Sequence, residues 1–363
     1  MILCSVGPGP GALKIPELCR LLSRDGYEVE VILEPGADRF VGPAAFARVA
    51  NVVSAPTGDV EALVFAPASA ETLAQLARGL NGGAASAAYE SGASPTIVAP
   101  GLDDATGEHP AVLENLRLLN EDGCYVVERR EGEIPEAEEL ATRVLGALGG
   151  PLAGTRLLVS AGGTREPIDS VRFVGNRSSG KMGSAVARVA ARMGAEVTVV
   201  AANVENTEPG VRWTPVETVD ELAAEILARS GENDALVMAA AVSDFKPATA
   251  LEEKVRRSEG LSIEFVATQD ILKEVRKENP DLFVVGFAAT HGDPVPDARE
   301  KLGAKGIDLV VGNDISKKGI GFGAEENEVH VVGPRNERFV SRASKEDVAR
   351  VILGVLAEEM KKE

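Results

Sequence analysis

Ser160 to Gly183 reads SAGGTREPIDSVRFVGNRSSGKMG, two glycine-rich turns joined by a polar loop. The first turn follows RLLVS at Arg156 to Ser160, an apolar run typical of a buried strand. The second turn precedes alanine and valine at helical spacing in Ser184 to Met193. We therefore expect Gly180 to Gly183 at a helix N-terminus, where unpaired N–H groups and the helix dipole favour an anion. The stretch predicts a strand–loop–helix unit that binds a phosphorylated small molecule.

The same alternation of short apolar runs and helical patterns continues along the whole chain. It is typical of mostly parallel sheets with helices on both faces. We expect an α/β protein with two Rossmann-like domains whose mostly parallel sheets are flanked by helices. The predicted strands are Ile2 to Val6, Val29 to Leu33, Ala62 to Phe65, Thr96 to Val98, Arg156 to Ser160, Glu196 to Ala201, Ala235 to Ala239, Leu282 to Phe287 and Asp308 to Val311. The predicted helices are Lys14 to Asp25, Ala70 to Leu80, Pro110 to Asn120, Ala137 to Leu148, Ser184 to Met193, Val219 to Ser230, Gln269 to Glu278, Asp297 to Ala304 and Lys345 to Glu359.

The length of 363 residues is comfortable for two domains, each with its own core. A polar stretch, ERREGEIPEAEE at Glu128 to Glu139, and the helix-breaking Gly149-Gly150-Pro151 indicate the boundary. We expect one domain at residues 1–148 and a second at 152–363.

Charge and composition limit the kinds of partner and ligand that we expect for this chain. A formal net charge of -18 argues against a nucleic-acid surface, because a polyanion would need a strong basic patch. No apolar run approaches the roughly 20 residues of a membrane span, and we expect a cytoplasmic protein. The singly placed Cys4, Cys19 and Cys124 predict buried free thiols. Lys14 is the only lysine before Lys181, which favours an anionic ligand in the second half.

The glycine block allows three interpretations. Gly175 to Met182 (GNRSSGKM) differs by one residue from the phosphate-binding loop of nucleotide hydrolases, but Met182 cannot ligate magnesium. A dinucleotide fingerprint would need G-x-G-x-x-G spacing, which Gly162-Gly163 and the long loop lack. Glycines that only turn the chain explain one turn well, but not two turns that enclose a set of polar residues.

Seven motifs together carry a family resemblance. They are AGGTREPID (Ala161 to Asp169), NRSSGKMG (Asn176 to Gly183), AAAVSDFKP (Ala239 to Pro247), KVRR (Lys254 to Arg257), QDIL (Gln269 to Leu272), VGFAAT (Val285 to Thr290) and GNDIS (Gly312 to Ser316). In this order and spacing, from about Leu152 to the C-terminus, they resemble the phosphopantothenate–cysteine ligase domain. That domain is usually fused behind a flavin-dependent phosphopantothenoylcysteine decarboxylase in coenzyme A biosynthesis.

The resemblance implies a ligase whose small-molecule substrates are 4'-phosphopantothenate, L-cysteine and CTP. CTP with Mg²⁺ would convert the acid to an acyl-cytidylate with release of pyrophosphate, and cysteine would displace CMP. By position in the family, Asn176 and Lys254 are the catalytic residues. The implied nucleotide-binding residues are Ala239, Ala240, Asp244, Lys254, Gln269, Asp270, Ile271, Leu272, Phe287, Lys301 and Lys305. The implied substrate-binding residues are Gly163, Asn176, Ser178, Ser179, Gly180, Lys181 and Ala241. The metal ligands stay unassigned.

Some of these assignments also follow from the residue pattern. Lys301 and Lys305 are four residues apart on a predicted helix and share one face, which suits a triphosphate. Gln269 replaces a usual proline of the family, and the choice of CTP over ATP rests on the resemblance alone. Lys254 lies in a polar stretch, Thr249 to Glu259, that could close over the site as a lid.

The first half resembles the decarboxylase partner in framework. The likeness is in LKIPELCRLL (Leu13 to Leu22), FAPASAETLAQLARGL (Phe65 to Leu80) and VAPGLDDATGEHPAVLENLRLL (Val98 to Leu119). The family's catalytic histidine, P-A-M-N asparagine and flap cysteine are missing. No histidine occurs before His109, which we expect on the surface, and Asp103 replaces the asparagine. We expect this domain to be inactive and FMN to be doubtful.

Alternatives remain open. One is the full bifunctional enzyme, which also decarboxylates phosphopantothenoylcysteine with FMN. A second is an NAD(P)-dependent oxidoreductase on the same fold class, and a third is a non-enzymatic scaffold. The resemblance further implies a homo-oligomer, either a ligase-domain dimer or a dodecamer.

Overall fold

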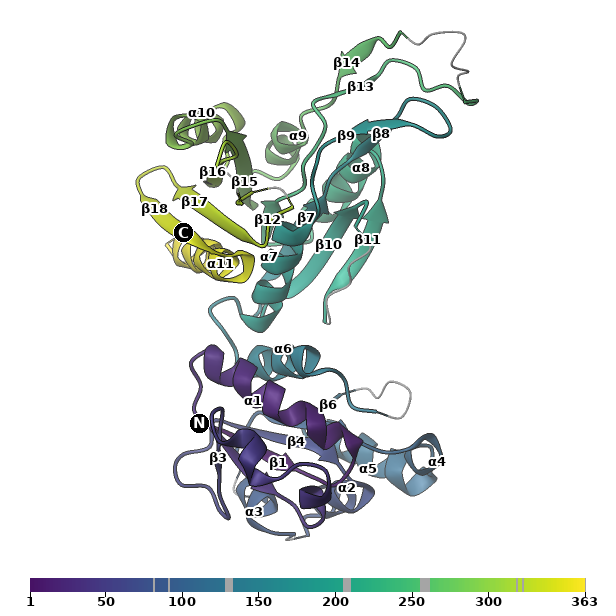
Figure 1. Cartoon of the computed structure of the whole chain (residues 1–363), viewed down its shortest axis with the longest axis vertical. Coiled ribbons are helices and arrows are strands. Elements are labelled where there is room, and N and C mark those ends of the chain that lie inside the picture. Colours follow the sequence, from purple (N-terminus) through teal and green to yellow (C-terminus); the bar gives the residue numbers. More distant parts are fainter. Residues whose placement is uncertain are drawn as a thin grey trace. The chain divides into compact units, whose positions relative to one another are not determined.

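The computed structural model divides into two compact units, Met1–Gly150 and Pro151–Glu363 (Figure 1). It describes residues 1–80, 82–90, 92–127, 133–204, 210–254, 262–317, 319–321 and 323–362. Each unit is built on one mostly parallel sheet with helices on both faces, which confirms the predicted fold class. Among the described helices, none has the length and apolarity needed to cross a bilayer.

The sheet of the first unit has the strand order β3-β2-β1-β4-β5-β6, and every neighbouring pair in it is parallel. Its strands are β1 (Ile2–Val6), β2 (Val29–Leu33), β3 (Asn51–Val52), β4 (Ala62–Ala68), β5 (Thr96–Pro100) and β6 (Tyr125–Val126). Along β1, Ile2, Cys4 and Val6 pack under α1 (Ile15–Arg24) and α6 (Ala137–Ala147). Leu3 instead faces the layer of α2 (Ala70–Ala77), α3 (Ala84–Glu90) and α5 (Pro110–Glu121), which also includes the short α4 (Asp104–Gly107).

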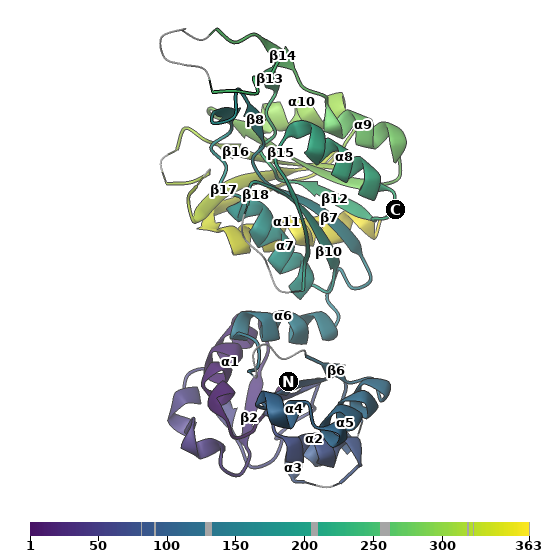
Figure 2. The ribbon, with the colours of Figure 1, turned by 90° about the vertical axis from the view of Figure 1, so that its right-hand side faces the viewer.

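The sheet of the second unit has the strand order β11-β10-β7-β12-β15-β16-β17-β18 (Figure 2). Its parallel strands are β7 (Arg156–Gly162), β10 (Glu196–Ala202), β11 (Arg212–Val216), β12 (Ala235–Met238), β15 (Phe283–Thr290) and β16 (Leu309–Asp314). The last two strands, β17 (Glu326–Val332) and β18 (Glu337–Ser344), are antiparallel. Two small hairpins, β8 (Arg165–Pro167) with β9 (Phe173–Gly175) and β13 (Phe245–Pro247) with β14 (Phe265–Ala267), form separate two-stranded sheets.

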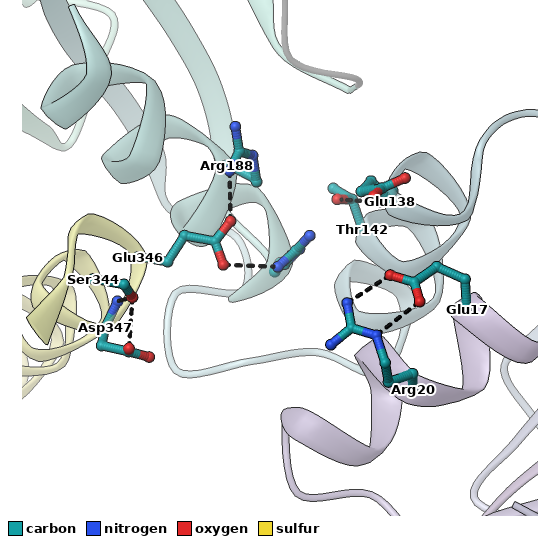
Figure 3. Close-up of polar contacts among 9 residues, drawn as sticks. Glu17, Arg20, Glu138, Thr142, Arg188, Ser344, Glu346 and Asp347 are labelled. Atoms are coloured by element: carbon teal, nitrogen blue, oxygen red, sulfur yellow. Dashed lines mark hydrogen bonds and ion pairs between the residues drawn. The ribbon is translucent and has the colours of Figure 1, made fainter. Parts of the chain in front are cut away.

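Five helices cover the two faces of this sheet. On one face lie α7 (Lys181–Arg192) and α11 (Lys345–Met360), and on the other lie α8 (Val219–Ser230), α9 (Ile271–Glu278) and α10 (Val295–Lys305). The alternation of β7 explains the division, because Leu157 and Val159 face the first layer and Leu158 faces the second. Arg188 of α7 donates to Glu346 of α11 at 2.5 Å and joins the first layer (Figure 3).

The structure differs from the sequence-based expectations at several elements. β17 and β18 are absent from the predicted strands, because their outward residues are polar and resemble a loop, although β17 alternates half-buried and buried positions. Helix α7 begins at Lys181, three residues before the predicted start. The three cysteines are buried and free, and His109 caps α5 from an exposed position, as expected.

The order of strands reverses direction between β7 and β12, and the N-terminus of α7 meets the sheet at this point. Gly180 caps the helix with φ 75°, a left-handed conformation that glycine adopts without strain. Gly183 faces Ala161 of β7, and a Cβ added to this glycine would lie 2.6 Å from the Ala161 Cβ. Helix and strand therefore approach more closely than any side chain at position 183 allows.

We expect Gly183→Ala to lower the free energy of unfolding of the second unit by about 1–3 kcal/mol, because the added methyl must push α7 away from β7. Trp213 is the only tryptophan of the chain and lies in β11, so its fluorescence during denaturation reports on this unit. Gly354→Ala in α11 is the matched control, since a Cβ there meets nothing within 4 Å. A Gly183→Ala protein as stable as Gly354→Ala would contradict the close-packing argument.

Candidate functional site

A cavity of about 610 Å³ opens where the strand order of the second sheet reverses. In open parallel sheets this point leaves a crevice outside the carboxyl ends of the strands. The described residues that line the cavity come from the loop before α7 and the start of α7, from β12 and the segment after it, and from the segment after β14 with the start of α9. Others come from β15, α10, β16 and the loop after it, β17, and the start of α11. Together they are Asn176, Ser178, Ser179, Gly180, Lys181, Met182, Gly183, Met238, Ala239, Ala240, Ala241, Val242, Asp244, Thr268, Gln269, Asp270, Ile271, Leu272, Phe287, Ala289, Lys301, Lys305, Asn313, Gly321, Asn327 and Lys345.

Hydrogen bonds hold the floor of the cavity in place. The backbone N–H of Ala240 donates to Ser160 Oγ at 3.1 Å, and that of Ala241 donates to the Gly162 carbonyl at 2.8 Å. The Thr164 N–H in turn donates to the Ala241 carbonyl at 3.2 Å. The segment after β12 is therefore tied to the loop after β7, and its small alanine side chains leave room for a ligand.

Asn176 lies on the wall beside the N-terminus of α7. Its Nδ2 donates to the Val242 carbonyl at 3.0 Å, which orients the amide and leaves a second N–H hydrogen. Helix α7 has no side-chain cap, so its first N–H groups and its dipole favour an anion at this end. Amide donor and helix N-terminus thus lie on the same side of the cavity.

Lys301 and Lys305 reach the opposite side from α10. Lys301 Nζ donates to the Phe287 carbonyl at 2.5 Å, and Lys305 Nζ pairs with the Asp270 carboxylate. Burial lowers the pKa of Lys301, and the charge of Lys305 lowers it further. Burial alone would raise the pKa of Asp270, but the hydrogen bonds from Lys305 and from the Lys273 N–H, together with the charges of these two lysines, outweigh burial and keep this pKa below its ordinary value. Two cations and one carboxylate therefore share this region.

A third set of charges lies at the starts of α7 and α11. Lys181 Nζ donates to the Gly323 carbonyl at 3.3 Å and pairs with the Glu325 carboxylate, and this pairing lowers the pKa of Glu325. Lys345 is buried, and burial together with the charge of Lys181 lowers its pKa. The described lining includes four lysines against two aspartates, so the cavity suits anions although the whole chain has a formal net charge of -18.

The structure brings almost all the predicted site residues to this one cavity. Gly163 lies just behind the lining, where it bridges to Ala241 and a Cβ added to it would meet Ser178 at 3.1 Å. Lys254 is the exception: it is exposed and outside the lining. The rest of the predicted KVRR motif, residues 255–257, lies outside the described residues, as does the end of the predicted lid. The catalytic role of Lys254 stays a prediction.

Four polar residues of the lining were not predicted: Thr268, Asn313, Asn327 and Lys345. Asn313 lies within the GNDIS motif, so the sequence contained a signal from which this residue could have been predicted. Asn327 and Lys345 reach the cavity only because β17 and β18 fold back antiparallel beside β16. Without that pairing, Lys345 looks like the first residue of a terminal helix.

The corresponding edge of the first sheet is different. Glu34 follows β2, and its carboxylate accepts hydrogen bonds from Ser5 Oγ at 2.8 Å and Thr72 Oγ1 at 2.9 Å. Pro8 and Pro10 stand in the loop after β1 and offer no N–H donor. A carboxylate at this edge would repel the phosphate of FMN, the cofactor that the resemblance implies.

The only lysine of the first unit is also engaged. Lys14 Nζ donates to the Ile134 carbonyl at 2.9 Å and pairs with Glu136 at 2.9 Å and Glu133 at 3.2 Å. With its cation paired and a carboxylate at the sheet edge, the residues present do not fit a flavin phosphate.

Two family models match the chain. Residues 152–360 match the DNA/pantothenate metabolism flavoprotein C-terminal domain, and residues 2–149 match the flavoprotein domain. Together these matches span both units.

Curated relatives and a solved structure resemble the chain as well. It is 31% identical over 395 residues to the coenzyme A biosynthesis bifunctional protein CoaBC of Bacillus subtilis, covering 98% of this chain and 96% of that protein. It is 37% identical over 371 residues to CoaBC of Mycobacterium tuberculosis, covering 90% and 88%. The crystal structure of the C-terminal domain of a CoaBC protein superposes with a TM-score of 0.52 at 30% identity, covering 59% of this chain and 100% of that one.

The similarity therefore extends over both halves and supports the bifunctional alternative better than a ligase alone. The chain belongs to the bifunctional coenzyme A biosynthesis family that joins a phosphopantothenoylcysteine decarboxylase domain to a phosphopantothenate–cysteine ligase domain.

Proposed function

We propose that the second unit is a phosphopantothenate–cysteine ligase that uses CTP. The observation that carries the proposal is the single cavity in which an oriented amide, an uncapped helix N-terminus and two lysines of α10 meet. Such a site can hold two anionic substrates side by side: a phosphorylated acid near α7 and a nucleotide near α10. Family membership supports the identity of the substrates.

The first step would form the activated acid. A carboxylate oxygen of 4'-phosphopantothenate attacks the α-phosphorus of CTP, and the bond to the leaving pyrophosphate breaks with its electron pair. Negative charge gathers on the phosphates, and Lys301 and Lys305 are the cations that support nucleotide binding here.

Magnesium fits the donor set of this region. Asp244 and Asp270 are the carboxylates among the described lining residues, and Mg²⁺ in nucleotide sites takes one or two carboxylates besides phosphates. Asp270 is paired with Lys305, so Asp244 is the residue that would hold the ion. The ion would offset the charge of the nucleotide phosphates.

The second step would join the acyl group to cysteine. The amine nitrogen of cysteine attacks the acyl carbon, the amide bond forms, and CMP leaves with the electron pair of the broken C–O bond while the amine loses a proton. The second N–H of Asn176 is the donor we assign to the oxyanion of this step. We also assign Lys254 to the first step, as the resemblance implies.

We expect the purified full-length protein to release pyrophosphate only when 4'-phosphopantothenate and a nucleotide are both present, with CTP preferred over ATP. Adding L-cysteine should then give phosphopantothenoylcysteine, detected by mass spectrometry. Release of pyrophosphate without the acid, or none with either nucleotide, would count against the ligase. Binding of NAD(P) instead would support the oxidoreductase alternative.

We expect Asn176→Asp to slow cysteine addition by about 10²–10³, because it removes the amide donor from the oxyanion. Quenched single-turnover reactions should show the acyl-cytidylate accumulating with near-normal pyrophosphate release. Lys254→Gln should instead block pyrophosphate release. Asn120→Asp, at an exposed position of α5 in the first unit, is the control and should behave as wild type. Wild-type turnover of Asn176→Asp would refute its assigned role.

We also propose that the first unit no longer decarboxylates phosphopantothenoylcysteine. The relatives are bifunctional, which favours an active decarboxylase, but the residues of this chain argue the opposite. The family's histidine, asparagine and flap cysteine are missing from the sequence, and Glu34 contributes a carboxylate at the edge where a phosphate would bind.

The purified protein should accordingly show no flavin absorbance in the visible range and release no carbon dioxide from phosphopantothenoylcysteine, with or without added FMN. The CoaBC protein of Bacillus subtilis serves as the comparison under the same conditions. A yellow preparation that decarboxylates would establish the bifunctional alternative, while leaving the ligase assignment intact.

A further inference from the structure

The first unit has a carboxylate at the point of its sheet where a ligand would place an anion. Its strand order reverses between β1 and β4, and ligands of open parallel sheets bind at such a reversal. The Glu34 N–H donates to the Val6 carbonyl at 2.9 Å, so the ladder between β1 and β2 continues one residue past β2. The Glu34 side chain therefore lies on the same face of the sheet as Ile32, which is the face that α2 covers.

Two buried hydroxyl groups donate to this carboxylate. Ser5 of β1 is 1% exposed and Thr72 of α2 is 4% exposed. Ser5 Oγ donates to one carboxylate oxygen of Glu34 at 2.8 Å, and Thr72 Oγ1 donates to the other at 2.9 Å. Because Thr72 uses its only hydroxyl proton in this way, Ser69 Oγ is the donor in its 2.8 Å contact with Thr72 Oγ1. The hydroxyls of three elements thus form a chain of donors that ends on one anion.

The backbone around the carboxylate also resembles a phosphate site. A Cβ added to Gly7, the residue after β1, would lie 3.2 Å from Glu34 Oε2, so the carboxylate closely approaches a glycine of this turn. Thr72 is the third residue of α2, which places the carboxylate at the first turn of that helix, where the dipole favours negative charge. A close glycine, hydroxyl donors and a helix N-terminus are the features by which sheets of this kind bind phosphate.

We propose that Glu34 is an internal anion that occupies the phosphate position of the first unit, so that this unit is structurally complete without a flavin. The inference rests on the proposed loss of flavin chemistry in this unit, which matches the flavoprotein family, and goes beyond it by naming the group that takes the position. The carboxylate supplies both acceptors for Ser5 and Thr72 and keeps other anions out by filling the same space. A variant without this carboxylate should therefore gain a site for inorganic phosphate.

The test follows thermal unfolding of the full-length protein in inorganic phosphate and in sodium chloride of equal ionic strength. The three tyrosines of the chain, Tyr27, Tyr89 and Tyr125, belong to the first unit and Trp213 belongs to the second, so the two fluorescence signals separate the units. The tyrosine midpoint of wild type should be the same in both salts. Glu34→Ala should unfold about 4–8 °C lower in chloride, because two hydrogen bonds to a charged group are lost, and phosphate should restore about 2–4 °C.

Matched variants separate occupation of the position from a general effect of charge. Glu71→Ala removes an exposed carboxylate from the same turn of α2 without opening the position, so phosphate should not stabilise it. Glu34→Gln keeps the position filled and should likewise be insensitive to phosphate. Ser5→Ala combined with Glu34→Ala removes one of the donors and should lose most of the phosphate effect. Glu34→Ser opens the position with a smaller side chain and should respond to phosphate as Glu34→Ala does, so the test does not depend on one variant.

Phosphate that leaves the tyrosine midpoints of Glu34→Ala and Glu34→Ser unchanged would overturn the proposal. Equal stabilisation of Glu71→Ala or Glu34→Gln would overturn it as well, because net charge alone would then explain the effect. Flavin absorbance in the purified wild-type protein would instead refute the proposed loss of flavin chemistry. A flavin-free wild type whose Glu34→Ala variant ignores phosphate would refute this inference alone.

Discussion

The close approach of α7 to β7 is the constraint on which the rest of the second unit depends. Gly183 lets the helix begin against Ala161, and Gly180 turns the chain so that the helix N-terminus faces the crevice. Because the strand order reverses at the same point, the segment after β12 is free to leave the sheet and line the opposite wall. The backbone at Gly180 and Gly183 and the reversal of strand order together form the cavity. The charged side chains then line it.

The cavity of the second unit differs in charge from the chain as a whole. The chain is strongly acidic, yet its described cavity lining has more lysines than aspartates. Three lysines of the lining have internal partners: Lys301 has the Phe287 carbonyl, Lys305 has Asp270, and Lys181 has Glu325 with the Gly323 carbonyl. Such pairing keeps a cationic cavity stable in the free protein, and anionic substrates exchange one set of partners for another.

The parallel strands of the two units follow the same order, but different side chains lie at the edge where that order reverses. Both have a reversal between their first strand and the strand that pairs on its other side. In the second unit the edge there is lined by small residues and helix N-termini, whereas in the first unit Glu34 bridges Ser5 and Thr72. The chemistry that a shared fold can support depends on the side chains at the edge of its sheet.

Local patterns in the sequence were sufficient for the fold class, for half of the described strands, for most of the described helices, and for many of the residues that follow the predicted strands, because hydrophobic periodicity and glycine positions act over short distances. They also led to the expectation that the first half lacks the family's catalytic residues, which stays a prediction. The antiparallel return of β17 and β18, which brings Asn327 and Lys345 to the cavity, was decided only by the tertiary structure. So was the contact of Glu34 with Ser5 and Thr72. Strand pairing and side-chain burial depend on partners far apart in the chain, and no local pattern specifies them.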